Sequence, residues 1–136
     1  MQSRVDYFLP KAFHAIKIVS VEDKTFFKNR NEGVLIKEYK GYISSLGANI
    51  VQAGVKAAIT FYEAKESGSK SDRRLVNAAI KYIIDCEDPN LQKVSYVDCI
   101  LSALLTNDEA SNQKIAMEIL DAATALKLAL RTYKME

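Results

Sequence analysis

The chain has 136 residues, of which 49% are hydrophobic and 26% charged, and its formal net charge is +2. This mix is typical of one folded globular domain and excludes wholesale disorder. The longest stretch without a charge, residues 41–55, is too short and too polar to span a membrane, and no basic-then-apolar leader opens the chain. We therefore expect a cytoplasmic protein without membrane contact, whose two cysteines, Cys86 and Cys99, are buried thiols in a reducing compartment.

Helical periodicity is the main signal along the first half of the chain. Only five glycines and two prolines interrupt the sequence, too few for the many turns of an all-β fold. Apolar residues recur at helical spacing over residues 5–19, and the helix is expected to begin or kink near Pro10. Residues 22–33 lose this pattern, which predicts an exposed loop. Two further helices are expected at about residues 36–53 and 55–66, separated by Gly54.

Three more helices are predicted in the second half. A short flexible connection at residues 67–71 leads to a fourth helix, which stops before Pro89. Its predicted buried face consists of Leu75, Val76, Ala79, Ile80 and Ile83. Capping boxes at Ser95 and Thr106 predict a fifth helix through Leu105 and a last helix that reaches the C-terminus. The predicted fold class is therefore all-α, with residues 1–136 forming a single compact bundle of about six helices.

The sequence lacks the residue patterns that most enzymes need. His14 is the only histidine, so one chain can hold neither a His-rich metal site nor a pair of histidines for acid–base catalysis. No phosphate-binding glycine loop and no nucleophile-elbow motif occurs. We therefore predict that the protein is not an enzyme and has no catalytic residues, no metal site and no cofactor.

Charge is sorted along the chain. Residues 1–81 hold 14 Lys and Arg against 8 Asp and Glu, whereas residues 82–126 hold 2 against 8, and the last ten residues are again basic. Such a dipolar surface can steer association, or let neighbouring copies of the chain meet with opposite charges. The alternative is an ordinary solvated surface on which the charges happen to be unevenly distributed.

The first predicted helix carries a basic face. Arg4, Tyr7, Lys11 and His14 recur at helical spacing and so share one side of it. Cations alternating with aromatic rings suit nucleic acid, because cations meet phosphates and rings stack on unpaired bases. The alternative is an ordinary polar face with a half-buried tyrosine.

Two more basic faces follow. On the second helix, Lys37 and Lys40 border a lane of small and polar residues that includes Gly41, Ser44 and Ala48. This lane would admit a phosphate strand or, in the alternative, a packed helix of the same fold. The last helix aligns three cations, which in the alternative are only solvated. The candidate RNA-binding residues are Arg4, Lys11, Lys37, Lys40, Lys127, Arg131 and Lys134.

One segment resembles a known family. Residues 37–50 read KEYKGYISSLGANI, and residues 52–62 continue through QAG to AAITFY. This segment resembles the small-subunit family of type III-B CRISPR effector complexes, the fifth subunit of the Cmr module. The opening YFLPKA at residues 7–12, and the alanine- and leucine-rich residues 122–134 with interspersed cations, fit the same family.

The resemblance implies a compact all-α protein without catalytic activity of its own. Several copies would stack inside an RNA-guided, RNA-targeting ribonucleoprotein for antiviral defence, beside neighbouring copies and the backbone subunits of the Cmr complex. They would line the channel that holds the guide RNA and the target RNA, and other subunits would cut. The alternative is a helical adaptor that binds only proteins and has no nucleic-acid role.

Overall fold

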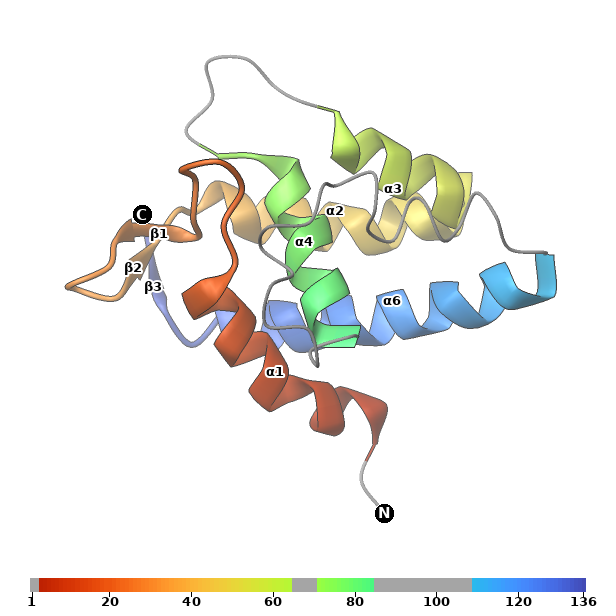
Figure 1. Cartoon of the computed structure of the whole chain (residues 1–136), viewed down its shortest axis with the longest axis horizontal. Coiled ribbons are helices and arrows are strands. Elements are labelled where there is room, and N and C mark those ends of the chain that lie inside the picture. Colours follow the sequence, from red (N-terminus) through yellow and green to blue (C-terminus); the bar gives the residue numbers. More distant parts are fainter. Residues whose placement is uncertain (1–2, 65–70, 85–108) are drawn as a thin grey trace.

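Five helices make up most of the part of the chain that the computed structural model describes, residues 3–64, 71–84 and 109–136. These helices are α1 (Arg4–Ile18), α2 (Glu38–Ala53), α3 (Val55–Glu63), α4 (Arg73–Ile84) and α6 (Glu109–Leu130). Figure 1 shows α4 in the middle, surrounded by the other four helices, all of which contact it. No helix within these described ranges is both long and apolar enough to cross a membrane.

Local sequence signals explain where the first helices begin and end. The Ser3 hydroxyl accepts a hydrogen bond of 3.0 Å from the backbone N–H of Asp6, which caps the start of α1. The helix therefore begins upstream of Pro10, which lies within it and is exposed. Gly54 joins α2 to α3 with φ of 94° and ψ of 159°, a backbone conformation that essentially only glycine adopts.

The predicted buried face of the fourth helix agrees with the observed core. Leu75, Val76, Ala79, Ile80 and Ile83 of α4 are all buried, as their spacing indicated. The other four described helices add apolar stripes to the same core: Phe8, Ala12 and Ile16 from α1, Tyr39, Ile43, Leu46 and Ile50 from α2, Ala58, Ile59 and Tyr62 from α3, and Ile119, Ala122, Leu126 and Ala129 from α6. Burial of these stripes fixes which face of each helix remains for partners.

A small sheet corrects the prediction of a purely helical chain. Strand β1 (Phe27–Asn29) pairs antiparallel with β2 (Val34–Leu35), which pairs parallel with β3 (Lys134–Met135). The prediction of an exposed loop over residues 22–33 is therefore wrong in part, since Phe26 is fully buried and residues 27–29 are a strand. Strands of two or three residues are too short to show the alternation that predicts a strand.

The predicted end of the last helix is also wrong. Helix α6 ends at Leu130 and does not reach the C-terminus, because the chain turns and residues 134–135 join the sheet. The Tyr133 ring packs edge-on against the Phe27 ring of β1, with ring centres 5.9 Å apart. Helical spacing in the sequence cannot predict this contact, because it joins two segments that are far apart along the chain.

The other helix boundaries are close to those predicted. The second helix begins at Glu38, two residues after its predicted start, and the third ends at Glu63, three residues before its predicted end. The predicted fifth helix at residues 95–105, the start of the last helix near Thr106, and both cysteines lie outside the described residues. The bundle of six helices is therefore not confirmed, although the fold is broadly all-α.

Candidate nucleic-acid interface

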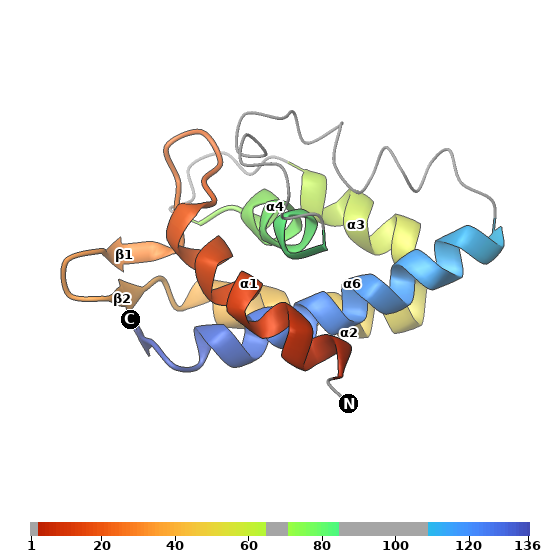
Figure 2. The same cartoon turned by 60° about the horizontal axis from the view of Figure 1, so that its bottom comes forward.

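Two antiparallel helices bring distant cations to the same level of the molecule. Helices α2 and α6 run in opposite directions (Figure 1), and α6 passes in front of α2 in Figure 2. The two helices contact each other, and a Cβ atom added to Gly47 would lie 3.9 Å from the Leu120 side chain. Lys40 precedes Gly47 by seven residues, and Lys127 follows Leu120 by seven. Each interval is about two turns, or roughly 10 Å along the helix. Lys40 and Lys127 therefore lie level with each other on neighbouring helices.

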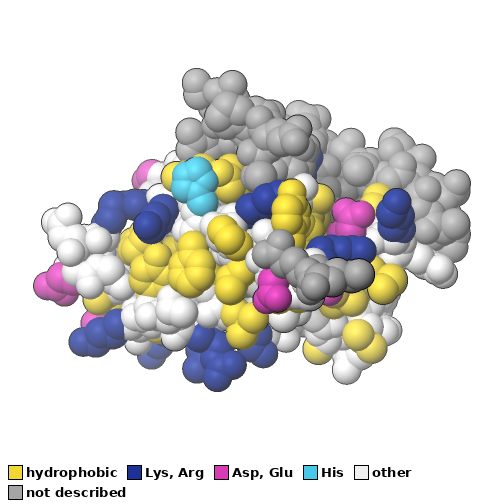
Figure 3. All heavy atoms as spheres, turned by 90° about the horizontal axis from the view of Figure 1, so that it is seen from below, with side chains coloured by type: hydrophobic (Ala, Val, Ile, Leu, Met, Phe, Trp, Pro, Cys, Tyr) yellow, Lys and Arg dark blue, Asp and Glu magenta, His cyan; other side chains and the backbone are white. Residues whose placement is uncertain are grey.

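The sheet extends this arrangement beyond the helix ends. Lys134 pairs directly with Val34, three residues before Lys37, so the C-terminal segment lies beside the start of α2. We call Lys37, Lys40, Lys127, Arg131 and Lys134 the basic surface; four of them are exposed, and Lys127 is half-buried. Figure 3 shows Lys and Arg side chains gathered along the left end and the lower edge of the molecule, where the sheet and α2 lie.

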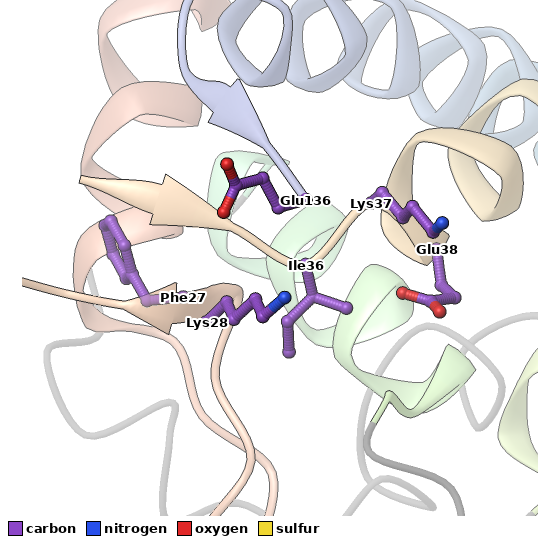
Figure 4. A pocket seen from close by; sticks show the side chains of 6 residues that line it. All are labelled: Phe27, Lys28, Ile36, Lys37, Glu38 and Glu136. Carbon is purple, nitrogen blue, oxygen red and sulfur yellow. The ribbon is translucent and has the colours of Figure 1, made fainter. Parts of the chain in front are cut away.

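One cation was missed by the sequence analysis. Lys28, exposed on β1, lines a hollow of about 570 Å³ together with Lys37, Glu38 and Glu136 (Figure 4). The hydrogen bond and charge of Lys134, 3.0 Å away, lower the pKa of Glu136, and the charge of Lys28 adds to this effect. The sequence does not single out Lys28, because this residue falls in a segment expected to be a loop. Helical spacing cannot assign a loop residue to one face of the molecule.

The two remaining candidates lie apart from the basic surface, on α1. Arg4 Nη1 lies 3.5 Å from Asp121 Oδ2 of α6, and the Lys11 ammonium lies 4.0 Å from the centre of the Tyr7 ring. His14 Nδ1 shares a hydrogen bond of 2.5 Å with the Tyr82 hydroxyl of α4. The predicted alternation of cations and rings is therefore present, but much of it contacts other parts of the chain.

The lane of small residues on α2 is open. Gly41, Ser44 and Ala48 are exposed, and a Cβ atom added to Gly41 would meet nothing within 4 Å. Among the described residues, these three positions do not pack against another helix, which was the alternative prediction for the lane. Close helix packing occurs instead at Gly47, one position away from Ala48 and on another side of α2.

Polar side chains form two groups in the interior, one at Asp72 and Arg74 and one at Asn77 and the partly buried Glu63. Asp72 accepts hydrogen bonds from the backbone and side chain of Arg74, at the start of α4. Burial raises the pKa of Glu63 to about 7, against the lowering effect of the hydrogen bond that Asn77 donates to it. Within the described ranges, no group of three or more His, Cys, Asp or Glu side chains could hold a metal ion.

Comparison with known protein families shows which family the chain belongs to. The family model Cas_Cmr5, described as CRISPR-associated protein, matches residues 15–131, which is most of the chain. The chain belongs to the Cas_Cmr5 family. This family comprises the small subunits of type III-B CRISPR complexes, which are generally non-catalytic. No curated protein and no solved structure matches the chain.

The Cas_Cmr5 match covers most of the candidate interface. Lys37, Lys40, Lys127 and Arg131 lie within residues 15–131, as does Lys28. Arg4, Lys11 and Lys134 lie outside that range. The core of the basic surface is thus part of the family domain.

Proposed function

We propose that this Cas_Cmr5 chain is a non-catalytic small subunit of an RNA-guided, RNA-targeting ribonucleoprotein of type III-B. Several copies stack beside the backbone subunits, along the channel that holds the guide RNA and the target RNA. The chain contacts RNA phosphates through the basic surface, with Arg4 and Lys11 as secondary contacts, and other subunits cut the RNA.

The observation that supports this proposal is the convergence of cations from three separate segments. Five of the seven candidate residues lie at the end of the molecule that holds the sheet, at the start of α2, at the end of α6 and on β3. Ammonium and guanidinium groups bind phosphates without reading sequence, so the guide RNA supplies the sequence information by base pairing.

Neighbouring copies are proposed to meet through opposite charges. The acidic stretch at residues 82–126 would face a basic surface on the next copy, although most of its acids lie outside the described residues. Charge pairs at the rim of an interface mainly set its register and association rate. We therefore expect the isolated chain to be monomeric or weakly associating.

The proposal is tested by the salt dependence of RNA binding. The double variant Lys37→Ala/Lys40→Ala removes two exposed cations at the start of α2 and keeps the helix, because alanine is a good helix former. Each phosphate contact on single-stranded RNA contributes about 0.7 to the slope of log affinity against log salt. We expect the double variant to flatten this slope by about one unit, equally on unrelated RNA sequences.

A matched control removes the same charge elsewhere. Lys56 and Lys114 are exposed lysines of α3 and α6, near the helix ends far from the sheet (Figure 1). The variant Lys56→Ala/Lys114→Ala should leave the salt slope nearly unchanged. Equal slopes for the two double variants and the unmodified chain would contradict the proposed RNA contact and favour a protein-only adaptor.

A further inference from the structure

A groove between α2 and α3 has features that the proposed phosphate contacts leave unexplained. It has a volume of about 440 Å³, and Gly41, Ser45 and Asn49 of α2 line it together with Phe61 of α3 and Arg73 of α4. A second hollow of about 310 Å³ shares Asn49 and Phe61 with it. The Phe61 ring therefore stands in the wall of both hollows.

Phe61 is an exposed aromatic ring held in place from one side. Its exposed fraction is 54%, so one face of the ring is open to solvent or to a ligand. The Arg73 guanidinium lies 4.9 Å from the centre of the Phe61 ring and 5.0 Å from the centre of the Tyr42 ring. An arginine stacked between two rings limits the motion of both.

The wall behind these rings is fixed by hydrogen bonds. The Tyr62 hydroxyl donates a bond of 2.5 Å to the backbone carbonyl of Tyr42, and the Tyr42 hydroxyl shares a bond of 2.8 Å with the Ser71 hydroxyl. These bonds join α3, α2 and the start of α4. The groove is thus a preformed site, so a ligand does not have to order it.

The surroundings of the groove favour a nucleotide over an apolar protein segment. Arg73 lies in its wall and Lys37 lies one helical turn before Gly41, against one acid, Glu38, among the lining residues. The side chains of Ser45 and Asn49 offer hydrogen-bond donors and acceptors for the edge of a base. Positive charge, an exposed ring and amide or hydroxyl groups together match an unpaired base on a phosphate backbone.

We propose that this groove binds one unpaired RNA base, which stacks on Phe61 while its backbone passes over Lys37. This inference rests on the proposed RNA-binding function and adds base stacking to it. The contact tolerates any base, because every base offers a π-face.

A single tryptophan reports directly on the groove. The chain has no tryptophan of its own, so Phe61→Trp introduces a unique fluorophore that also keeps an aromatic ring for stacking. Titration with single-stranded oligouridine should quench its fluorescence and retain the affinity of the unmodified chain. The control Met117→Trp places a tryptophan at another exposed apolar position, on α6, and should show little quenching.

A second variant separates stacking from charge. Phe61→Ala should weaken oligouridine binding roughly 5- to 150-fold and leave the salt slope unchanged, because stacking releases no counterions. If Phe61→Ala binds as the unmodified chain does, or if Phe61→Trp is not quenched, the stacking site is refuted while the lysine contacts stand. Quenching that rises with protein concentration in the absence of RNA would instead show that the groove is a protein contact. Absence of any RNA binding by the unmodified chain would overturn both proposals.

Discussion

Replacing Asp72 with asparagine removes one charge from an ion pair that lies almost wholly inside the protein. The exposed fractions of Asp72 and Arg74 are 1% and 8%. Arg74 Nη2 lies 2.6 Å from Asp72 Oδ2, and Arg74 Nε lies 3.1 Å from both carboxylate oxygens. Burial raises the pKa of Asp72, but the hydrogen bonds and charge of Arg74 outweigh it and hold the pKa below its usual value. The pair is therefore charged at neutral pH.

The expected loss of stability depends on which interaction partners Arg74 keeps in the variant. Removing one partner of a buried ion pair typically costs about 3–5 kcal/mol, because the other charge stays buried. Glu22 Oε1 lies 3.5 Å from Arg74 Nη2 and remains in Asp72→Asn. Asparagine also keeps an oxygen for the backbone N–H of Arg74, which lies 2.9 Å from Asp72 Oδ1. We therefore expect the lower end of the range, about 3 kcal/mol.

Urea denaturation followed by circular dichroism at pH 7 measures this change. The variant Asp72→Asn should unfold at a lower urea concentration with an unchanged slope of free energy against urea. The double variant Asp72→Asn/Arg74→Met removes both charges and should be more stable than Asp72→Asn alone. An unchanged urea midpoint for Asp72→Asn, or a double variant less stable than Asp72→Asn, would refute the reasoning.

Two further predictions concern stability. Because burial raises the pKa of Glu63 from 4.5 to about 7, the native state holds this proton to higher pH than the unfolded chain, and stability should fall as pH rises between these values. The fall should be at most about 3 kcal/mol, because solvent screens this partly exposed carboxyl, and it should disappear in Glu63→Gln. An equal fall in that variant, measured by urea denaturation across this range, would contradict the reasoning. Gly54→Ala should lower the free energy of unfolding by about 1–3 kcal/mol, because φ is 94° there. The matched Gly41→Ala, inside α2 and with open space around it, should raise it by about 0.5–1 kcal/mol, so equal effects would argue against backbone strain.

The helices and their buried faces could be predicted because the information for them is local. Apolar spacing in α4 identified Leu75, Val76 and Ile80 as buried residues, and Gly54 marked the end of α2. Both signals depend on residues within one or two turns of each other. Lys40 and Lys127 were visible in this way, as cations of single helices. The expected alignment of Lys127, Arg131 and Lys134 on one helix is wrong, because α6 ends at Leu130 and Lys134 lies on β3.

The arrangement of those faces was decided by tertiary structure. Nothing near Val34 indicates that Lys134, a hundred residues later, pairs with it and brings the C-terminal cation beside α2. The same holds for Arg4, whose charge meets Asp121 of α6.

What the sequence determined by itself is the helical class, the apolar stripes and the family to which the chain belongs. Only the tertiary structure decided that cations of α2, α6 and β3 share one end, that Asp72 and Arg74 form a buried pair, and that Phe61 lines an open groove. The physical reason is that helix periodicity follows from backbone geometry over a few residues. Contacts between segments depend instead on how all the buried faces pack together, which no short stretch of sequence records.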